Sequence, residues 1–263
     1  MRKHMIPVVL ILCLMLAAAG CKKKEKVDLS DVTTQAPEQT TQAQTKETKE
    51  TETAGETTAA PKGAYAQETT YLHKNLGIKY PQIVNMEDSD RQTAVNDQIK
   101  EDVMAVIEAN GLDTEKDSLN LTYKVSALDR DKIVIFYEGS FEKDGAADPT
   151  ALFLTDTISL KTGKHTRLSD YVDGKTLSSL LTADGEYQVV GDDEDLKKEV
   201  RKYLASQKAS DLEKIFNNAD FGGAGKDFPK SFSYERQGVI YFTVPVSHAL
   251  GDYALLSYTP ETK

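Results

Sequence analysis

The fold is decided by residues 119–141, which read LNLTYKVSALDRDKIVIFYEGSF. Apolar residues in the first half alternate with mostly polar ones, as they do in a half-buried strand. These apolar positions are Leu119, Leu121, Tyr123, Val125 and Ala127. Residues 129–131, Asp-Arg-Asp, predict a turn, and a second apolar run follows from Ile133 to Phe141. The stretch therefore predicts two antiparallel strands joined as a hairpin.

Upstream of this hairpin, the sequence predicts a strand and then a long helix. The strand covers Leu76 to Val84 and contains Tyr80-Pro81. Asp88 or Ser89 is a suitable N-cap for the helix, which ends at Asn110-Gly111. Its apolar residues recur at helical spacing, at Val95, Ile99, Val103, Val106 and Ile107.

Downstream, a second hairpin is predicted from residues 151–160, the turn 161–164 and the short segment to Leu168. Three helices follow. Leu177, Leu180 and Leu181 mark the first, residues 196–204 the second, and the capping-box pattern from Ser210 to Glu213 opens the third. The chain then returns to strands at residues 232–244 and 253–258.

Strands that pair as hairpins, with helices in separate blocks, indicate an α+β fold with antiparallel sheets and packed helices. We expect two adjoining subdomains, at residues 69–147 and 148–263.

The N-terminus has the composition of a secretory signal peptide. Arg2 and Lys3 precede an uncharged apolar run to Ala19, which is followed by Gly20 and Cys21. The segment Ala18-Ala19-Gly20-Cys21 resembles the lipobox of bacterial lipoproteins, although Ala18 stands where Leu is usual. The resemblance implies a signal peptide at residues 1–20, cleavage between Gly20 and Cys21, and acylation of Cys21. An ordinary secretory cleavage site or an uncleaved short anchor is the alternative.

Residues 21–68 predict a disordered tether behind the acylated cysteine. Thr, Glu, Lys and Gln dominate, and residues 30–63 contain no aromatic side chain. Such a stretch cannot bury enough apolar surface to offset the entropy of ordering it. The basic run Lys22-Lys23-Lys24-Glu25-Lys26 would lie beside lipid headgroups, or is simply a solvated charge run. Its threonines are candidates for O-glycosylation.

Charge and cysteine content exclude several classes of function. Residues 71–263 contain 33 acidic and 23 basic side chains. This acidic excess repels phosphate backbones, so we expect no nucleic-acid partner. Cys13 and Cys21 are the two cysteines of the chain, so a folded part that follows Cys21 has no thiol for catalysis, disulfides or metal binding. The predicted location is the outer face of the cell membrane, with the lipid bilayer bound through Cys21.

A search for catalytic or ligand-binding spacing finds no strong motif. His73, His165 and His248 are too far apart in sequence for a helical zinc motif, and a lone histidine is more often a surface or core residue. Ser247-His248 with Asp252 is suggestive, but adjacent side chains on a strand point to opposite faces. The Gly-rich residues 222–225 and the acidic residues 192–195 are better explained as a loop and a helix start.

The sequence therefore predicts no catalytic residues, no metal ligands and no cofactor, and it leaves the ligand-binding residues unidentified. A pair of carboxylates for glycoside hydrolysis stays open, because sequence cannot place two acids at the required separation.

The chain from about residue 70 to about residue 260 resembles a pair of extracytoplasmic domains of unassigned function. These domains occur in lysozyme-sensing anti-sigma factors of Gram-positive bacteria and ahead of the catalytic domain in some peptidoglycan deacetylases. The first half is similar at Ile78–Ile83 and at Asn96–Ile99. The second half is similar at Thr162-Gly163-Lys164, Leu168–Tyr171, Gly238–Phe242, Val244-Pro245 and Gly251. The shared residues are mostly in turns and strands, and no catalytic residue is among them.

From these observations we expect an anchored module of the cell envelope that binds or senses a ligand and is not an enzyme. The resemblance implies lysozyme or another basic wall-active protein as partner. A wall-active enzyme with an unrecognised carboxylate site and a structural envelope lipoprotein are the alternatives.

Lipidation at Cys21 is directly testable. Cells grown with labelled palmitate should label the wild-type chain and leave Cys21→Ala unlabelled, because only the thiol forms the thioether. Wild-type chain released into the medium at full yield would contradict the anchor.

Overall fold

The computed structural model of the protein describes residues 63–183, 185–223 and 227–260. The predicted signal peptide, Cys21 and the tether up to residue 62 lie outside these ranges. Among the described helices, none combines the length and the apolar character needed to cross a bilayer.

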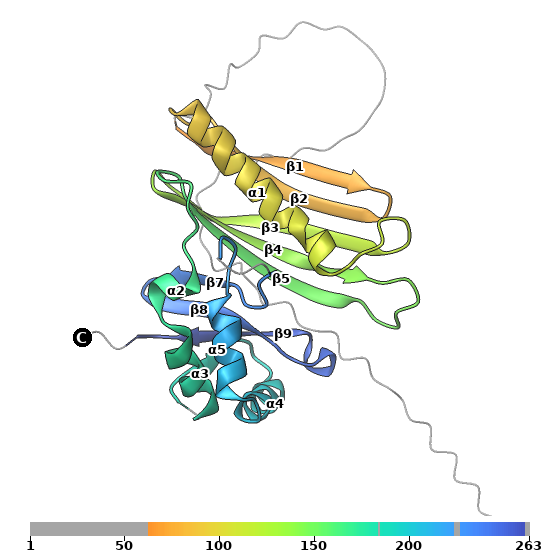
Figure 1. Cartoon of the computed structure of the whole chain (residues 1–263), viewed down its shortest axis with the longest axis vertical. Coiled ribbons are helices and arrows are strands. Elements are labelled where there is room, and N and C mark those ends of the chain that lie inside the picture. The colour runs from red at the N-terminus through yellow and green to blue at the C-terminus, as the bar shows by residue number, and fades with distance from the viewer. Residues whose placement is uncertain (1–62, 184, 224–226, 261–263) are drawn as a thin grey trace, which may run out of the picture.

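The first half of the described chain forms a five-stranded sheet in the order β1-β2-β3-β4-β5. The helix α1, Ser89–Ala109, lies across one face of this sheet (Figure 1). The strands are β1 Tyr65–His73, β2 Leu76–Val84, β3 Ser118–Leu128, β4 Lys132–Glu142 and β5 Thr150–Ser159. The predicted strand at 76–84 and the hairpin at 119–141 are confirmed, with a bulge between Val125 and Ala127.

Helix α1 begins and ends where its capping residues predict. The Asp88 carboxylate accepts a hydrogen bond from the Arg91 N–H at 2.9 Å, and Asn110 is the C-cap. Its apolar stripe is buried against the sheet, at Val95, Ile99, Val103 and Val106. Opposite this stripe, the side chains face solvent, so α1 is a one-sided cover for the sheet.

The α+β class is confirmed, with one difference in strand direction. Strands β2 and β3 run parallel, whereas the other pairs of the five-stranded sheet are antiparallel. The reason is α1, which carries the chain across the sheet before β3 begins, as a crossover connection must.

The second half forms a four-stranded antiparallel sheet in the order β6-β9-β8-β7. The strands are β6 Gln188–Val189, β7 Ser233–Arg236, β8 Val239–Pro245 and β9 Tyr253–Tyr258. The helices are α2 Leu168–Tyr171, α3 Gly174–Thr182, α4 Glu194–Ala205 and α5 Ala209–Asn217, with the 3-10 helix η2 His248–Leu250. Helices α3, α4 and α5 share a core with β8 and β9.

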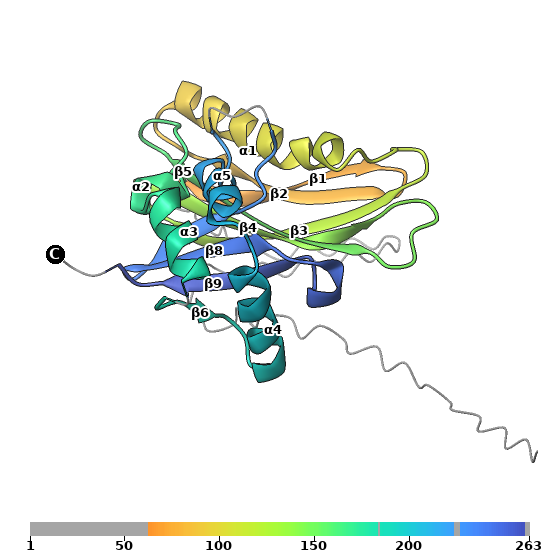
Figure 2. The same ribbon diagram turned by 60° about the horizontal axis from the view of Figure 1, so that its bottom comes forward.

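The two sheets also pack against each other. Both views place β8 and β9 on the side of the five-stranded sheet away from α1 (Figures 1 and 2). A separate apolar cluster fills the space between the sheets, formed by Val134, Phe136, Phe153, Tyr234 and Leu255. This third cluster packs the two sheets against each other, beside a separate core within each half.

Four local expectations need correction. The boundary at 147/148 separates β5 from its sheet, yet β5 pairs with β4 from Lys132 to Phe141. The tether was predicted through residue 68, but β1 already begins at Tyr65. Helix α5 begins at Ala209 after Lys208, without a side-chain cap, so Ser210 opens no capping box. After β5, the chain makes a single bridge from Ile158 to His165 rather than a full hairpin.

The buried stripe of α1 gives a stability prediction. Ile99 is fully buried, so Ile99→Asp places an unpaired charge in the core and should cost several kcal/mol. Lys100→Asp introduces the same side chain at an exposed neighbouring position and should change the free energy of unfolding by about 0.5 kcal/mol or less. Thermal or chemical denaturation measures both, and equal stability of the two variants would contradict the packing of α1.

Candidate functional site

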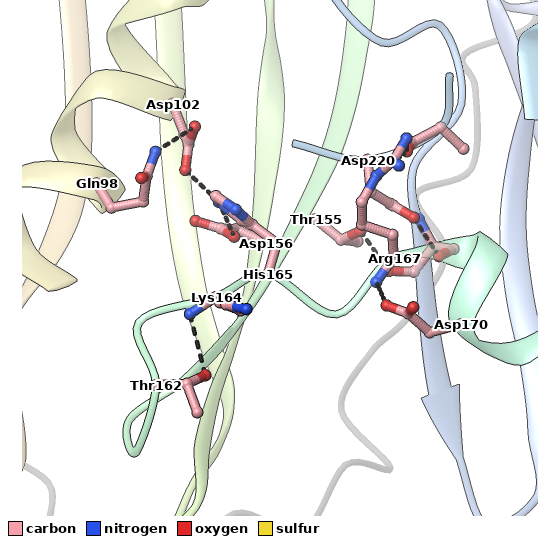
Figure 3. A network of polar contacts seen from close by, with 12 residues as sticks. Gln98, Asp102, Thr155, Asp156, Thr162, Lys164, His165, Arg167, Asp170 and Asp220 are labelled. Atoms are coloured by element: carbon pink, nitrogen blue, oxygen red, sulfur yellow. Dashed lines mark hydrogen bonds and ion pairs between the residues drawn. The ribbon is translucent and has the colours of Figure 1, made fainter. Parts of the chain in front are cut away.

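Three ionisable side chains from distant parts of the chain meet beneath α1. His165 Nε2 lies 2.7 Å from Asp102 Oδ2 and 3.6 Å from Asp156 Oδ1 (Figure 3). One ligand-type atom from each of the three residues falls within 4.8 Å of the other two. We call these three residues the buried triad.

Regular secondary structure holds two members of the buried triad. Asp102 belongs to the buried face of α1, and Gln98 one turn earlier donates to its Oδ1 at 3.1 Å. Asp156 belongs to β5 and pairs with Ile135 of β4, whose side chain is part of the core beneath α1.

The third member, His165, is fixed by the chain that returns after β5. It forms the bridge to Ile158, and the next residue, Thr166, donates its N–H to Thr157 O at 2.8 Å. Gly222, with φ +73°, packs on the imidazole so closely that a Cβ there would collide with the ring. A backbone at this position and this φ requires glycine.

The buried triad is shielded from solvent and incompletely hydrogen bonded. The side chains of Asp102, Asp156 and His165 are 9%, 0% and 8% exposed. Within the described part of the chain, neither carboxylate oxygen of Asp156 has a hydrogen-bond partner, and the hydroxyl of the buried Tyr137 on β4 has none either. Unpartnered buried polar atoms are costly, so this arrangement needs an explanation.

Burial sets the protonation of these groups. Loss of water raises the pKa of Asp156 well above its usual range, and the nearby Asp102 charge adds to this effect. Burial alone would lower the pKa of His165, but the hydrogen bond to Asp102 and the charges of Asp156 and Asp102 outweigh it and raise that pKa. Burial also raises the pKa of the Tyr137 hydroxyl well above its usual range, with further contributions from Asp156 and Asp102.

Chemically, this arrangement can hold a small cation or a proton. Imidazole nitrogen and carboxylate oxygen are both metal ligands. The described part of the chain contains no cysteine, so no thiolate can take part. The exposures are too small for a sugar or a peptide to reach the carboxylates, so the buried triad does not resemble an open hydrolase site.

A second polar cluster lies close by and connects the two sheets (Figure 3). The buried Asp220 carboxylate accepts hydrogen bonds from Leu168 N at 2.6 Å, Ser233 N at 2.5 Å and Ser233 Oγ at 2.6 Å. Thr155 Oγ1 of β5 donates to Ser233 O of β7 at 2.7 Å. Arg167 donates to the carbonyl of Asn217, the last residue of α5, and to the carbonyl of Ala219 just after the helix.

The other histidines singled out from the sequence lie elsewhere. His73 is exposed at the end of β1, with Nε2 3.8 Å from Glu115 Oε1. His248 Nδ1 lies 2.8 Å from Asp252 Oδ1, and Asp252 Oδ2 accepts from the Ala151 N–H at 2.8 Å. The His248–Asp252 pair therefore ties η2 to β5.

The acidic residues 192–195 and the Gly-rich residues 222–225 were interpreted from the sequence as a helix start and a loop. Asp193 caps α4 and accepts from the N–H groups of Asp195 and Leu196, which confirms that the acidic residues stabilise a helix start. Gly222 and Gly223 lie against His165 and Arg167, whereas residues 224 and 225 lie outside the described ranges.

Local sequence spacing singles out His165 without its two acidic neighbours. A signal was present at Asp102, because this charged residue occupies the buried face of α1 next to Val103. Asp156 interrupts the predicted strand at 151–160 in the same way. What the sequence could not supply was their proximity, since 63 residues separate Asp102 from His165.

Asp220 gives a pH-dependent stability prediction. Burial raises the pKa of Asp220 to about 6, although three hydrogen bonds oppose this shift. A carboxyl group with a higher pKa in the folded than in the unfolded chain takes up protons on folding. Its contribution to the free energy of unfolding should therefore fall by up to about 3 kcal/mol as the pH rises from about 4 through about 6.

Asp220→Asn lacks this titration. The stability difference between wild type and Asp220→Asn should shrink over that pH range, as measured by denaturant titration at each pH. Ser231→Ala, which removes a nearby buried hydroxyl, should keep the wild-type pH dependence. A wild type and Asp220→Asn that respond identically to pH would refute the assignment.

No protein-family model and no curated protein matches the chain in sequence. Among solved structures, the chain is similar to a DUF3298 family member from Bacteroides fragilis, with 12% identity, a TM-score of 0.41, and coverage of 74% of this chain and 89% of that one. It is also similar to a DUF3298 family protein from Pseudomonas aeruginosa, with 12% identity, a TM-score of 0.35, and coverage of 70% and 82%. The structural neighbours are thus members of a domain family of unknown function.

Proposed function

We propose that this protein is a lipid-anchored module on the outer face of the cell membrane that binds or senses a basic protein of the lysozyme type. The observation that carries the proposal is an acidic stripe on the exposed face of α1. The anchor rests on Cys21 and the apolar run before it, and the type of partner on the charge and on the resemblance of residues 70–260 described above.

The acidic stripe consists of Asp90, Asp97, Glu101 and Glu108. At 3.6 residues per turn, these four side chains lie within about 40° of one another around the helix axis. All four are exposed and lie opposite the buried apolar stripe. None of them forms an ion pair among the described residues.

The position of α1 makes this surface available to a large partner. The helix is the outermost layer of the molecule on its side of the five-stranded sheet (Figures 1 and 2). A 21-residue helix is about 30 Å long, which is the scale of a small protein's face. The stripe therefore presents a continuous row of negative charge rather than an isolated carboxylate.

Opposite charge would mainly accelerate association. Complementary potentials steer the encounter of two proteins and raise the on-rate, and exposed pairs are screened by salt beyond about 10 Å at 0.1 M. A tether predicted from residue 21 up to the start of β1 at Tyr65 would give the domain room to meet a partner that arrives from outside.

The buried triad favours binding over the alternative of a wall-active hydrolase. A glycosidase needs two carboxylates on either side of a bound sugar. The side chains of Asp102 and Asp156 are 9% and 0% exposed, which leaves no access for a sugar to this pair.

Binding to a basic lysozyme tests the proposal. Isothermal titration of the full chain at about 50 mM and 300 mM salt should show binding that weakens about tenfold or more at the higher salt. Asp97→Lys/Glu101→Lys reverses the centre of the acidic stripe and should weaken binding by about tenfold or more at the lower salt.

The matched control is Glu186→Lys/Asp192→Lys, which changes the net charge equally at exposed positions that precede β6 and α4 in the chain. This variant should bind within about threefold of wild type. Absence of heat with wild type at low salt would refute the lysozyme proposal, and equal losses in both variants would show that net charge rather than the stripe is recognised.

A further inference from the structure

We propose that Asp102, Asp156 and His165 form a binding site for one divalent transition-metal ion, with Zn²⁺ as the expected occupant. The proposal does not depend on the partner of the acidic stripe. It assigns a ligand to a part of the molecule that the binding function leaves unexplained.

The charge balance of the buried triad is the first argument. Two carboxylates face one imidazole, and the side chains are 0–9% exposed. A protonated His165 would neutralise Asp102, with which it is in contact at 2.7 Å, but Asp156 would remain. A divalent cation neutralises both carboxylates at once, so the buried cluster carries no net charge.

The unpartnered atoms are the second and independent argument. Among the residues that the structure describes, neither oxygen of Asp156 has a hydrogen-bond partner, so protonation would give it a donor with no acceptor. Tyr137, on the neighbouring strand, also has a hydroxyl without a partner, although its side chain is fully buried. A metal ion accepts the lone pairs of Asp156. A metal-bound water or carboxylate would accept a hydrogen bond from the Tyr137 hydroxyl.

The donor set indicates the kind of metal. One nitrogen and two carboxylate oxygens, without a thiolate, are ligands that zinc accepts, commonly with water in a fourth position. Calcium and magnesium prefer six or more oxygen ligands and are disfavoured by the imidazole. Mn²⁺ accepts the same mixture more weakly and is the natural comparison.

Neighbouring residues orient the side chains of the buried triad by hydrogen bonds and packing, as they do around metal ligands. Gln98 donates to Asp102 Oδ1 and leaves Oδ2 directed at His165. The bridge from His165 to Ile158 and the contact with Gly222 fix the imidazole. Such contacts orient ligands and typically change metal affinity about 10- to 100-fold when removed.

Metal binding must displace a proton. Zinc at about 2.0–2.1 Å from both His165 Nε2 and an Asp102 oxygen needs these atoms to move apart from their present 2.7 Å. A cationic His165 then releases its Nε2 proton to solvent and keeps the Nδ1 proton, and a protonated Asp156 releases its own proton. Binding should therefore release protons, and the measured heat should depend on the ionisation enthalpy of the buffer.

The test is titration of the full chain with Zn²⁺ alone, after removal of metal by a chelator. Wild type should bind one equivalent more than Asp156→Asn or His165→Gln, and its melting temperature should rise by several degrees with Zn²⁺. In both variants the affinity for this Zn²⁺ ion should fall by about 100-fold or more. His248→Gln, which alters an exposed histidine that also contacts an aspartate, should retain it.

The variants also separate a metal site from a purely structural cluster. Asp156→Asn removes an unpartnered carboxylate, so the metal-free variant should be at least as stable as metal-free wild type. Stability rising with Zn²⁺ in wild type but not in Asp156→Asn supports the site. Binding of Co²⁺ to wild type should give visible d–d bands, a readout that needs no variant to fold.

Three results would overturn the proposal. These are wild type that binds no more Zn²⁺ than the two variants, Zn²⁺ that leaves the melting temperature unchanged, and Ca²⁺ or Mg²⁺ that compete equally well. Either of the first two would mean that the buried triad is held by protons and hydrogen bonds alone, and the third would mean that the site does not select a transition metal.

Discussion

The structure depends on β4 being buried on both faces. Ile133, Ile135 and Tyr137 contact the core beneath α1, while Val134 and Phe136 contact the second sheet. One strand of alternating apolar side chains thus belongs to two cores at once. Every other layer is positioned relative to it: α1 on one side, and β7 and β9 with their helices on the other. A shift of β4 by one residue would exchange the two cores, so its register is strongly specified.

This arrangement explains which parts of the fold could be predicted. The alternation at 119–127 and the spacing from Val95 to Val106 identify β3 and α1, because each element has one buried face. Strand β1 was missed, since it is an edge strand whose residues are mostly exposed and polar, such as Gln67, Glu68 and Thr70. The parallel pairing of β2 with β3 was not predictable either. Hydrophobic periodicity indicates which face of a strand is buried, but not which strand lies beside it.

The candidate site was less predictable than the fold for the same reason. Asp102 and Asp156 each occupy a position where the pattern calls for an apolar residue, and this irregularity is visible in the sequence. Their proximity to His165 arises only when α1 packs on the sheet that contains β5 and the chain returns from the turn at 161–164. A search by local spacing, such as two histidines on one helical turn, cannot detect ligands contributed by three separate elements.

The placement of β1 has a mechanical consequence. Any force transmitted along the chain before residue 63 enters the domain at Tyr65, the first residue of this edge strand. Strand β1 is held by its antiparallel pairing with β2 over nine residues, and it buries little of its own surface. Under load β1 is the strand of the five-stranded sheet whose detachment costs least, because β2 to β5 are anchored by α1 and by the second sheet. Peeling of β1 would uncover the edge of β2 without disturbing the outer face of α1.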